Sequence, residues 1–98
     1  MIKFKSYESF LIFSSNISLK DLNLLSLYYK EKLKNWGGQH INAKIYFLNS
    51  SYISILGQNN TLIFCLKITF NLLSFNIKLF QKLLKLNLKL KKYLILNI

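Results

Sequence analysis

Side chains able to do acid–base or nucleophilic chemistry are few and scattered in this sequence. His40 is the only histidine, Cys65 is the only cysteine, and the only acids are Glu8, Asp21 and Glu31. A general base needs a nucleophile or an orienting acid at a suitable spacing, and none of these residues falls in such a constellation. The sequence also lacks a glycine-rich phosphate loop and a metal-ligand spacing. We therefore expect no enzyme activity, no catalytic residues, no metal and no cofactor.

The lysines offer a different chemistry, which is the neutralisation of phosphate. Fourteen lysines face three acids in 98 residues, arginine is absent, and the formal net charge is +11. Self-repulsion on this scale disfavours a free compact monomer, so the charge predicts a partner that is negative, either nucleic acid or an anionic membrane face. Lysine contacts phosphate as a point charge, without the bidentate geometry of arginine.

The composition carries a second message. Lys, Asn, Ile, Phe, Tyr and Leu dominate, Ala43 is the only alanine, and valine and proline are missing. The favoured residues have A/T-rich codons, so we interpret the bias as that of an A/T-rich genome such as an organelle's. An Arg-rich amphipathic presequence is not visible, and an organelle protein of this kind is expected to be made inside the organelle.

The elements that position the lysines follow from periodicity in one small domain, residues 1–98. Alternation predicts strands over 2–7 and 93–98, and apolar runs predict strands over 43–48 and 61–73. The turn residues 57–60 between the last two runs predict an extended β-hairpin whose tip spans about 49–60. A first helix is expected from an N-cap at Ser18 to the stop at Gly37 and Gly38, with these residues on one face: Leu22, Leu25, Tyr29 and Leu33.

A second helix is expected from an N-cap at Asn76 to about Leu88. One apolar stripe holds Ile77, Phe80, Leu84 and Leu88, and a second holds Leu79, Leu83, Leu86 and Leu90. One stripe should pack on the sheet, and a neighbouring chain is expected to bury the other. The order of elements predicts an α+β, ferredoxin-like βαββαβ fold, with an antiparallel sheet and two helices on one face.

Three stretches share a pattern with a known family. Residues 80–88, FQKLLKLNL, resemble a final helix with an apolar-Leu-apolar-basic-Leu-Asp-Leu pattern, and residues 2–8, IKFKSYE, end the first strand in a Lys-small-aromatic-acid run. Lys44 and residues 49–52, NSSY, fall at the start of the second strand and on the hairpin. These features resemble small-subunit ribosomal protein S-ten over most of the chain. The family's proline-rich bend and hairpin arginines are missing, and of its Ser-Pro-His segment only Ser50 matches.

The resemblance implies a structural protein in the head of the small ribosomal subunit. Its partners would be small-subunit rRNA and neighbouring ribosomal proteins, with no small-molecule substrate and no stable membrane insertion. With the codon bias, it implies location in the mitochondrion.

The candidate RNA-binding residues come from two sources. Charge favours Lys78, Lys82, Lys85 and Lys89 as a phosphate-binding stripe, together with Lys3, Lys5 and Lys44. Tyr52, Asn59 and Asn60 on the hairpin tip could stack on or donate to RNA, although turn chemistry alone also explains the two asparagines. The resemblance adds Tyr7, Ser50 and Ser51. Trp36 is expected to pack at a helix end.

Two membrane hypotheses stay open from the sequence. Residues 61–75 form an apolar run that suits a small subunit of an organelle inner-membrane complex, but a span needs about 20 residues, and Lys67 and Asn71 interrupt the run. The second helix, from Asn76 to about Leu88, could instead lie on a membrane surface.

Overall fold

In the part of the chain that the structure describes, four strands and two α-helices follow one another in the predicted order. The computed structural model describes residues 3–13, 17–48 and 63–98. The elements are β1 (Phe4–Phe13), α1 (Leu19–Asn35), β2 (Gln39–Leu48), β3 (Ile63–Leu73), the short 3-10 helix η2 (Ser74–Asn76), α2 (Ile77–Lys85) and β4 (Leu90–Asn97).

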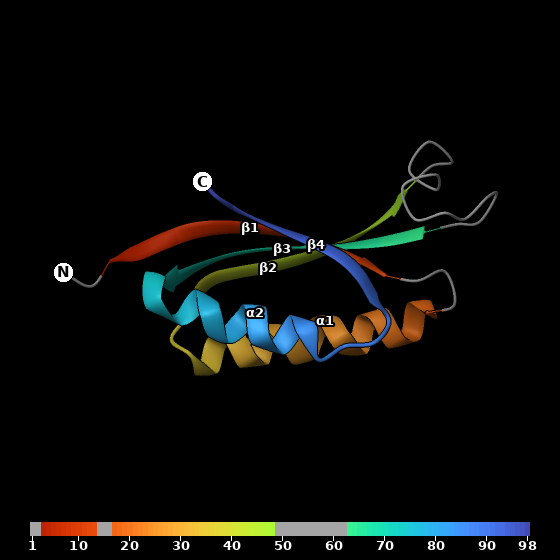
Figure 1. The fold of residues 1–98 in the computed structure, drawn as a ribbon, viewed down its shortest axis with the longest axis horizontal. Coiled ribbons are helices and arrows are strands. Elements are labelled where there is room, and N and C mark those ends of the chain that lie inside the picture. Colours follow the sequence, from red (N-terminus) through yellow and green to blue (C-terminus); the bar gives the residue numbers. More distant parts are fainter. Residues whose placement is uncertain (1–2, 14–16, 49–62) are drawn as a thin grey trace.

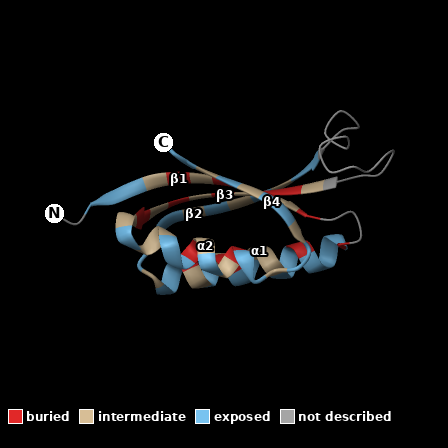
Figure 2. Ribbon diagram, in the orientation of Figure 1, coloured by how far each residue is buried: buried red, intermediate tan, exposed pale blue. Residues whose placement is uncertain are grey.

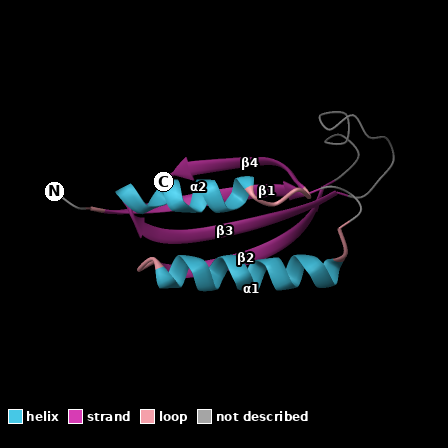
Figure 3. Ribbon diagram, turned by 60° about the horizontal axis from the view of Figure 1, so that its bottom comes forward, coloured by secondary structure: helices cyan, strands magenta, loops and turns pink. Residues whose placement is uncertain are grey.

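The sheet has the strand order β2-β3-β1-β4, and every neighbouring pair is antiparallel. Both helices cover the same face, with α1 on the β2 side and α2 on the β4 side (Figures 1 and 3). The predicted ferredoxin-like α+β fold is therefore confirmed, with two helices on one face of the sheet. The predicted hairpin tip and its turn lie outside the described residues.

The first strand is longer than the sequence predicted. The expected strand covered 2–7, whereas β1 runs to Phe13 and pairs with β3 and β4 along its length. Its alternate residues from Tyr7 to Phe13 face the helices and are buried. Ser9 is the polar member of this set, and its hydroxyl donates to the carbonyl of Ile68 at 2.9 Å. That bond satisfies the buried hydroxyl, so the strand continues through a position that broke the apolar alternation.

Local signals fix both ends of α1 where they were predicted. The Ser18 hydroxyl accepts the amide of Asp21 at 3.0 Å, as an N-cap does. At the other end, the amides of Gly37 and Gly38 donate to the carbonyls of Lys34 and Leu33 at 3.0 and 2.8 Å. This is the Schellman arrangement, and it needs the left-handed backbone that Gly37 adopts at φ 83°.

The second helix is shorter than expected, because it ends at Lys85 rather than near Leu88. Asn87 explains the early end. Its side chain accepts the amide of Lys89 at 2.9 Å and donates to the Tyr29 hydroxyl at 3.3 Å, so the chain turns toward β4. Phe80 and Leu84 of the first stripe face the sheet and are buried, but Leu88, predicted to share their face, is 94 % exposed because the helix has already ended. Asn76 occupies the N-cap position, but its side chain accepts no amide of α2 and instead donates to the Trp36 carbonyl at 3.1 Å.

The core lies between the sheet and the two helices, where the buried residues gather (Figure 2). Phe80 of α2 sits at its centre with no exposed surface. Its ring meets Tyr29 of α1 edge-on at 6.1 Å and Phe70 of β3 edge-on at 5.2 Å, measured between centroids. One aromatic side chain therefore joins both helices to the sheet. Trp36 packs half-buried against this core, as predicted.

Candidate nucleic-acid interface

Lysine side chains converge where α2 ends and β4 begins. Lys85, from the last turn of α2, and Lys91 and Lys92, from the start of β4, line one hollow of about 180 Å³ together with Asn87 and Tyr93. All three lysines are exposed. We call Lys85, Lys91 and Lys92 the α2–β4 cluster. Three lysine side chains that line one hollow, beside an amide and a phenol that can donate hydrogen bonds, suit a phosphate group.

Within the described residues, none of the three acids Glu8, Asp21 and Glu31 pairs with this cluster. Among the described residues two ion pairs form: Glu8 lies 3.7 Å from the ammonium of Lys67, and Asp21 lies 3.8 Å from that of Lys89. Both acids are thus occupied by lysines outside the cluster. The cluster therefore keeps its positive potential for a ligand.

Three of the four lysines predicted to form one stripe lie on α2. Lys78, Lys82 and Lys85 are exposed on α2, as expected. Lys89 lies beyond the end of the helix, and its ion pair with Asp21 ties the α2–β4 turn to the start of α1. The structure gives Lys89 a structural contact where the sequence predicted a phosphate contact.

The structure places Tyr7, which was predicted to bind RNA, in the hydrophobic core. Its side chain is 6 % exposed and packs on Phe70, with ring centroids 5.5 Å apart. Burial raises the pKa of its hydroxyl. The alternation of β1 places Tyr7 on the helix-covered face, so its ring cannot stack on a base without leaving the core.

The other candidates are separated in space. Lys3 and Lys5 are exposed at the start of β1, at the end of the molecule opposite the α2–β4 turn (Figure 1). Lys44 lies on the open face of the sheet, directly opposite Lys67. The remaining candidates, Ser50, Ser51, Tyr52, Asn59 and Asn60, lie outside the described residues.

Sequence reasoning missed Lys67, Lys91 and Lys92. A usable signal existed for each. Lys67 is the single charge in an apolar strand, which indicates that its side of the strand faces solvent. Lys91 and Lys92 belong to the run Lys-Leu-Lys-Lys at 89–92, which begins just after the helix.

An apolar groove lies beside the cluster, between α1 and the end of α2. It encloses about 430 Å³ and is lined mostly by leucine and tyrosine side chains, including Leu25, Tyr28, Leu83, Leu86 and Leu88. Two members of the second apolar stripe, Leu79 and Leu86, are exposed, whereas Leu83 and Leu90 pack partly buried against the core. Half of that stripe therefore stays open in the single chain, together with Leu88. Exposed apolar surface of this kind is characteristic of sites that contact other molecules.

The described residues offer little else for chemistry. No three His, Cys, Asp or Glu side chains among them come together as metal ligands would. Cys65 is buried, and burial raises the pKa of its thiol, which makes it a poor nucleophile. His40 is exposed with a backbone φ of 52°. Within the described part of the chain, no helix combines the length and apolar character required to cross a membrane.

A comparison of structures finds a similar fold, whereas the comparisons of sequence find no match. No protein-family model matches the chain, and no curated protein matches it. Among solved structures, the chain is similar to the crystal structure of 30S ribosomal protein S6 from Thermotoga maritima. The TM-score is 0.78 at 16 % identity, and the match covers 98 % of this chain and 89 % of the other. At that identity, the likeness shows the shared ferredoxin-like fold.

Proposed function

We propose that this chain is a structural protein of the small ribosomal subunit and binds rRNA through its phosphates. The observation that carries the proposal is the α2–β4 cluster, in which three exposed lysines line one hollow while Glu8 and Asp21 pair with other lysines. Phosphate contacts of this kind position a protein on RNA without reading the base sequence. No step of chemistry is required of the chain.

Three further observations support a ribosomal setting. The fold is that of a protein named for the 30S subunit, and the residues that resemble S-ten name a second protein of the same subunit. The apolar groove beside the cluster suits a neighbouring ribosomal protein, since obligate contacts bury such surface. The finer proposal is that the protein is of the S-ten type, lies in the subunit head and works in mitochondrial ribosomes.

The structure weakens the two membrane hypotheses. Most of the apolar run at 61–75 forms β3, which is paired on both sides by β1 and β2. The main apolar face of α2, with Phe80 and Leu84, is buried against the sheet and is unavailable to a membrane surface. The ribosomal proposal uses both segments as they lie in the fold.

Sedimentation tests the proposal directly. A mitochondrial lysate is run on a sucrose gradient, with and without RNase, and the chain is followed by mass spectrometry. We expect it to migrate with the small subunit and to leave that fraction after RNase treatment. Migration with a detergent-solubilised membrane complex, unchanged by RNase, would contradict the proposal. Cross-linking within the purified subunit then tests the finer proposal, because cross-links to proteins outside the head exclude the S-ten position.

A further inference from the structure

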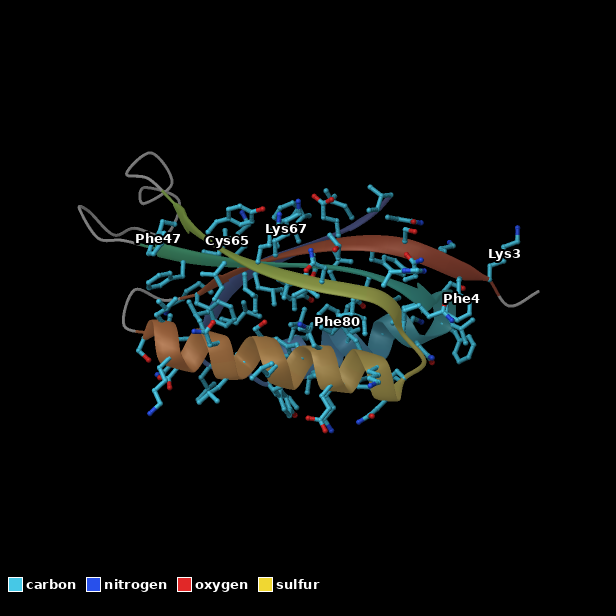
Figure 4. All side chains as sticks on the ribbon, turned by 180° about the vertical axis from the view of Figure 1, so that it is seen from behind. Lys3, Phe4, Phe47, Cys65, Lys67 and Phe80 are labelled. Carbon is cyan, nitrogen blue, oxygen red and sulfur yellow. The ribbon has the colours of Figure 1, made fainter. Side chains whose placement is uncertain are left out.

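The face of the sheet that the helices leave open carries its own set of cationic and aromatic side chains. The register of the strands places Lys44, Lys67, Phe10 and Leu94 side by side in one row across the sheet. The adjoining row holds Tyr46, Cys65, Ile12 and Lys92. Figure 4 shows Lys67 on the side away from the helices and Phe80 between the sheet and the helices.

The two rows are close enough to form one binding surface. Neighbouring strands lie about 4.8 Å apart, and residues two apart on a strand lie about 7 Å apart, so the rows span roughly 15 Å by 7 Å between Cα atoms. We call Phe10, Lys44, Tyr46 and Lys67 the open-face patch. Lys92 stands at its border and also lines the hollow of the α2–β4 cluster, so the two surfaces are continuous.

The rings of the patch are not needed by the core. Tyr46 is 42 % exposed, and Phe10 is half-buried on the open face. The core is built from the opposite side of the same strands. Aromatic side chains displayed beside lysines on a solvent-facing sheet provide stacking surfaces for unpaired bases.

The two contacts that hold the Lys67 ammonium could be replaced by contacts with a ligand. Its ammonium lies 5.7 Å from the Phe10 ring centroid and 3.7 Å from the Glu8 carboxylate. Ion pairs that water can reach contribute little to stability, so losing this one costs little. A base that stacks on Phe10 would displace Lys67 from the ring and release its charge toward a phosphate.

We propose that the open-face patch binds a single-stranded segment of RNA, with one base stacked on Phe10, another on Tyr46, and phosphates contacted by Lys44 and Lys67. The inference rests on the proposed function for the identity of the polymer. The charge of the patch demands a polyanion, because Glu8 is the only acid in these rows and the row beside them among the described residues. The two rings favour unpaired nucleotides over a duplex, whose bases are already stacked on each other.

Binding of a short fluorescent oligouridine to the full chain tests this, with anisotropy measured over a range of salt concentrations. We expect Phe10→Leu with Tyr46→Leu to weaken binding by about fivefold to a hundredfold for each ring, with the salt dependence unchanged. Lys44→Gln with Lys67→Gln should make the slope of log K against log salt shallower by about 1.4, since each phosphate contact on a single strand contributes about 0.7. Glu8→Gln should strengthen binding, because it releases Lys67.

The matched control is Lys30→Gln with Lys34→Gln, which removes the same charge from α1, where no candidate RNA-binding residue lies. We expect it to leave the slope for the oligouridine unchanged, since charges beyond about 8 Å are screened at physiological salt. Wild-type affinity in the variant lacking both rings overturns the inference. The inference is also overturned if inorganic polyphosphate, which has charge but no bases, competes with the oligouridine equally well. It is overturned as well if ultracentrifugation shows a dimer of this chain that buries the open-face patch.

A measurement on the unaltered protein covers the case in which a variant fails to fold. Ultraviolet cross-linking to the oligouridine, mapped by mass spectrometry, should mark peptides of β1 and β2 that contain Phe10 and Tyr46. Cross-links confined to α2 and β4 would overturn the inference. Sedimentation with the small subunit, combined with absent oligouridine binding, would refute the open-face patch alone and leave the ribosomal proposal standing.

Discussion

Removing the α2–β4 cluster should change how binding to structured rRNA depends on salt. The perturbation is the triple substitution of Lys85, Lys91 and Lys92 by glutamine, which keeps polar side chains of similar length and deletes three charges. All three side chains are exposed, so the fold should survive the change. The matched control is Lys30→Gln, Lys32→Gln and Lys34→Gln, which deletes three charges from the last turns of α1.

The magnitude follows from counterion release. Each phosphate contact on a duplex contributes about 0.9 to the slope of log K against log salt, so three contacts contribute about 2.7. Between about 50 and 200 mM salt, the wild-type affinity should therefore fall about 40-fold more than the affinity of the cluster variant. The α1 control variant should keep the wild-type slope, because its lysines do not line the hollow.

The assay is filter binding of the full chain to a folded fragment of small-subunit rRNA at a series of salt concentrations. Circular dichroism of each variant confirms that the fold is retained. An equal change of slope in the cluster variant and the α1 variant would refute the reasoning. It would mean that total charge, and not the convergence of three lysines around one hollow, determines binding.

Three further predictions concern the fold. Phe80→Ala should lower the free energy of unfolding by about 3–5 kcal/mol in urea denaturation followed by tryptophan fluorescence, because it empties the centre of the core. Phe75→Ala, at a side chain 60 % exposed, should change it by less than about 0.5 kcal/mol, and equal losses would contradict the packing. Ser18→Ala should cost about 1 kcal/mol through the lost N-cap, whereas Ser18→Asp should retain most of it, and a neutral Ser18→Ala would argue against the cap. Burial raises the pKa of the Cys65 thiol and the Tyr29 hydroxyl in the folded state. Their contribution to the free energy of unfolding is therefore fully present below the unfolded-state pKa values of 9.0 and 10.0, and it is lost as pH rises through the folded-state pKa values. The urea midpoint should therefore fall between about pH 8 and pH 11, a range chosen to bracket these two pKa values. A midpoint that stays level or rises over that range would contradict the prediction.

Some lysines of the candidate site could be predicted from the sequence, and others could not. The charge imbalance pointed to phosphate, and Lys78, Lys82 and Lys85 were found because their spacing matches one helix face. Lys91 and Lys92 escaped, since only the path of the chain after Asn87 returns them to the end of α2. The open-face patch needs the register of three strands, which no single segment encodes.

Tyr7 shows the same limit from the other side. Its neighbours in sequence resemble a family whose residues contact RNA, yet the face on which it lies depends on which side of β1 the helices cover. A shift of one residue in the predicted alternation moves every side chain of a strand to the other face. Packing against Phe70 decided that face for Tyr7.

By itself the sequence determined the elements whose signals are local. It fixed α1 between Ser18 and Gly37, because an N-cap hydroxyl and a left-handed glycine act within one helical turn of each end. It also determined the order of strands and helices, and with it the fold. Tertiary structure alone decided where β1 and α2 end, which side of the sheet is covered, and which lysines meet. Those outcomes depend on contacts such as those of Ser9 with Ile68 and Asn87 with Tyr29, whose partners lie far apart along the chain.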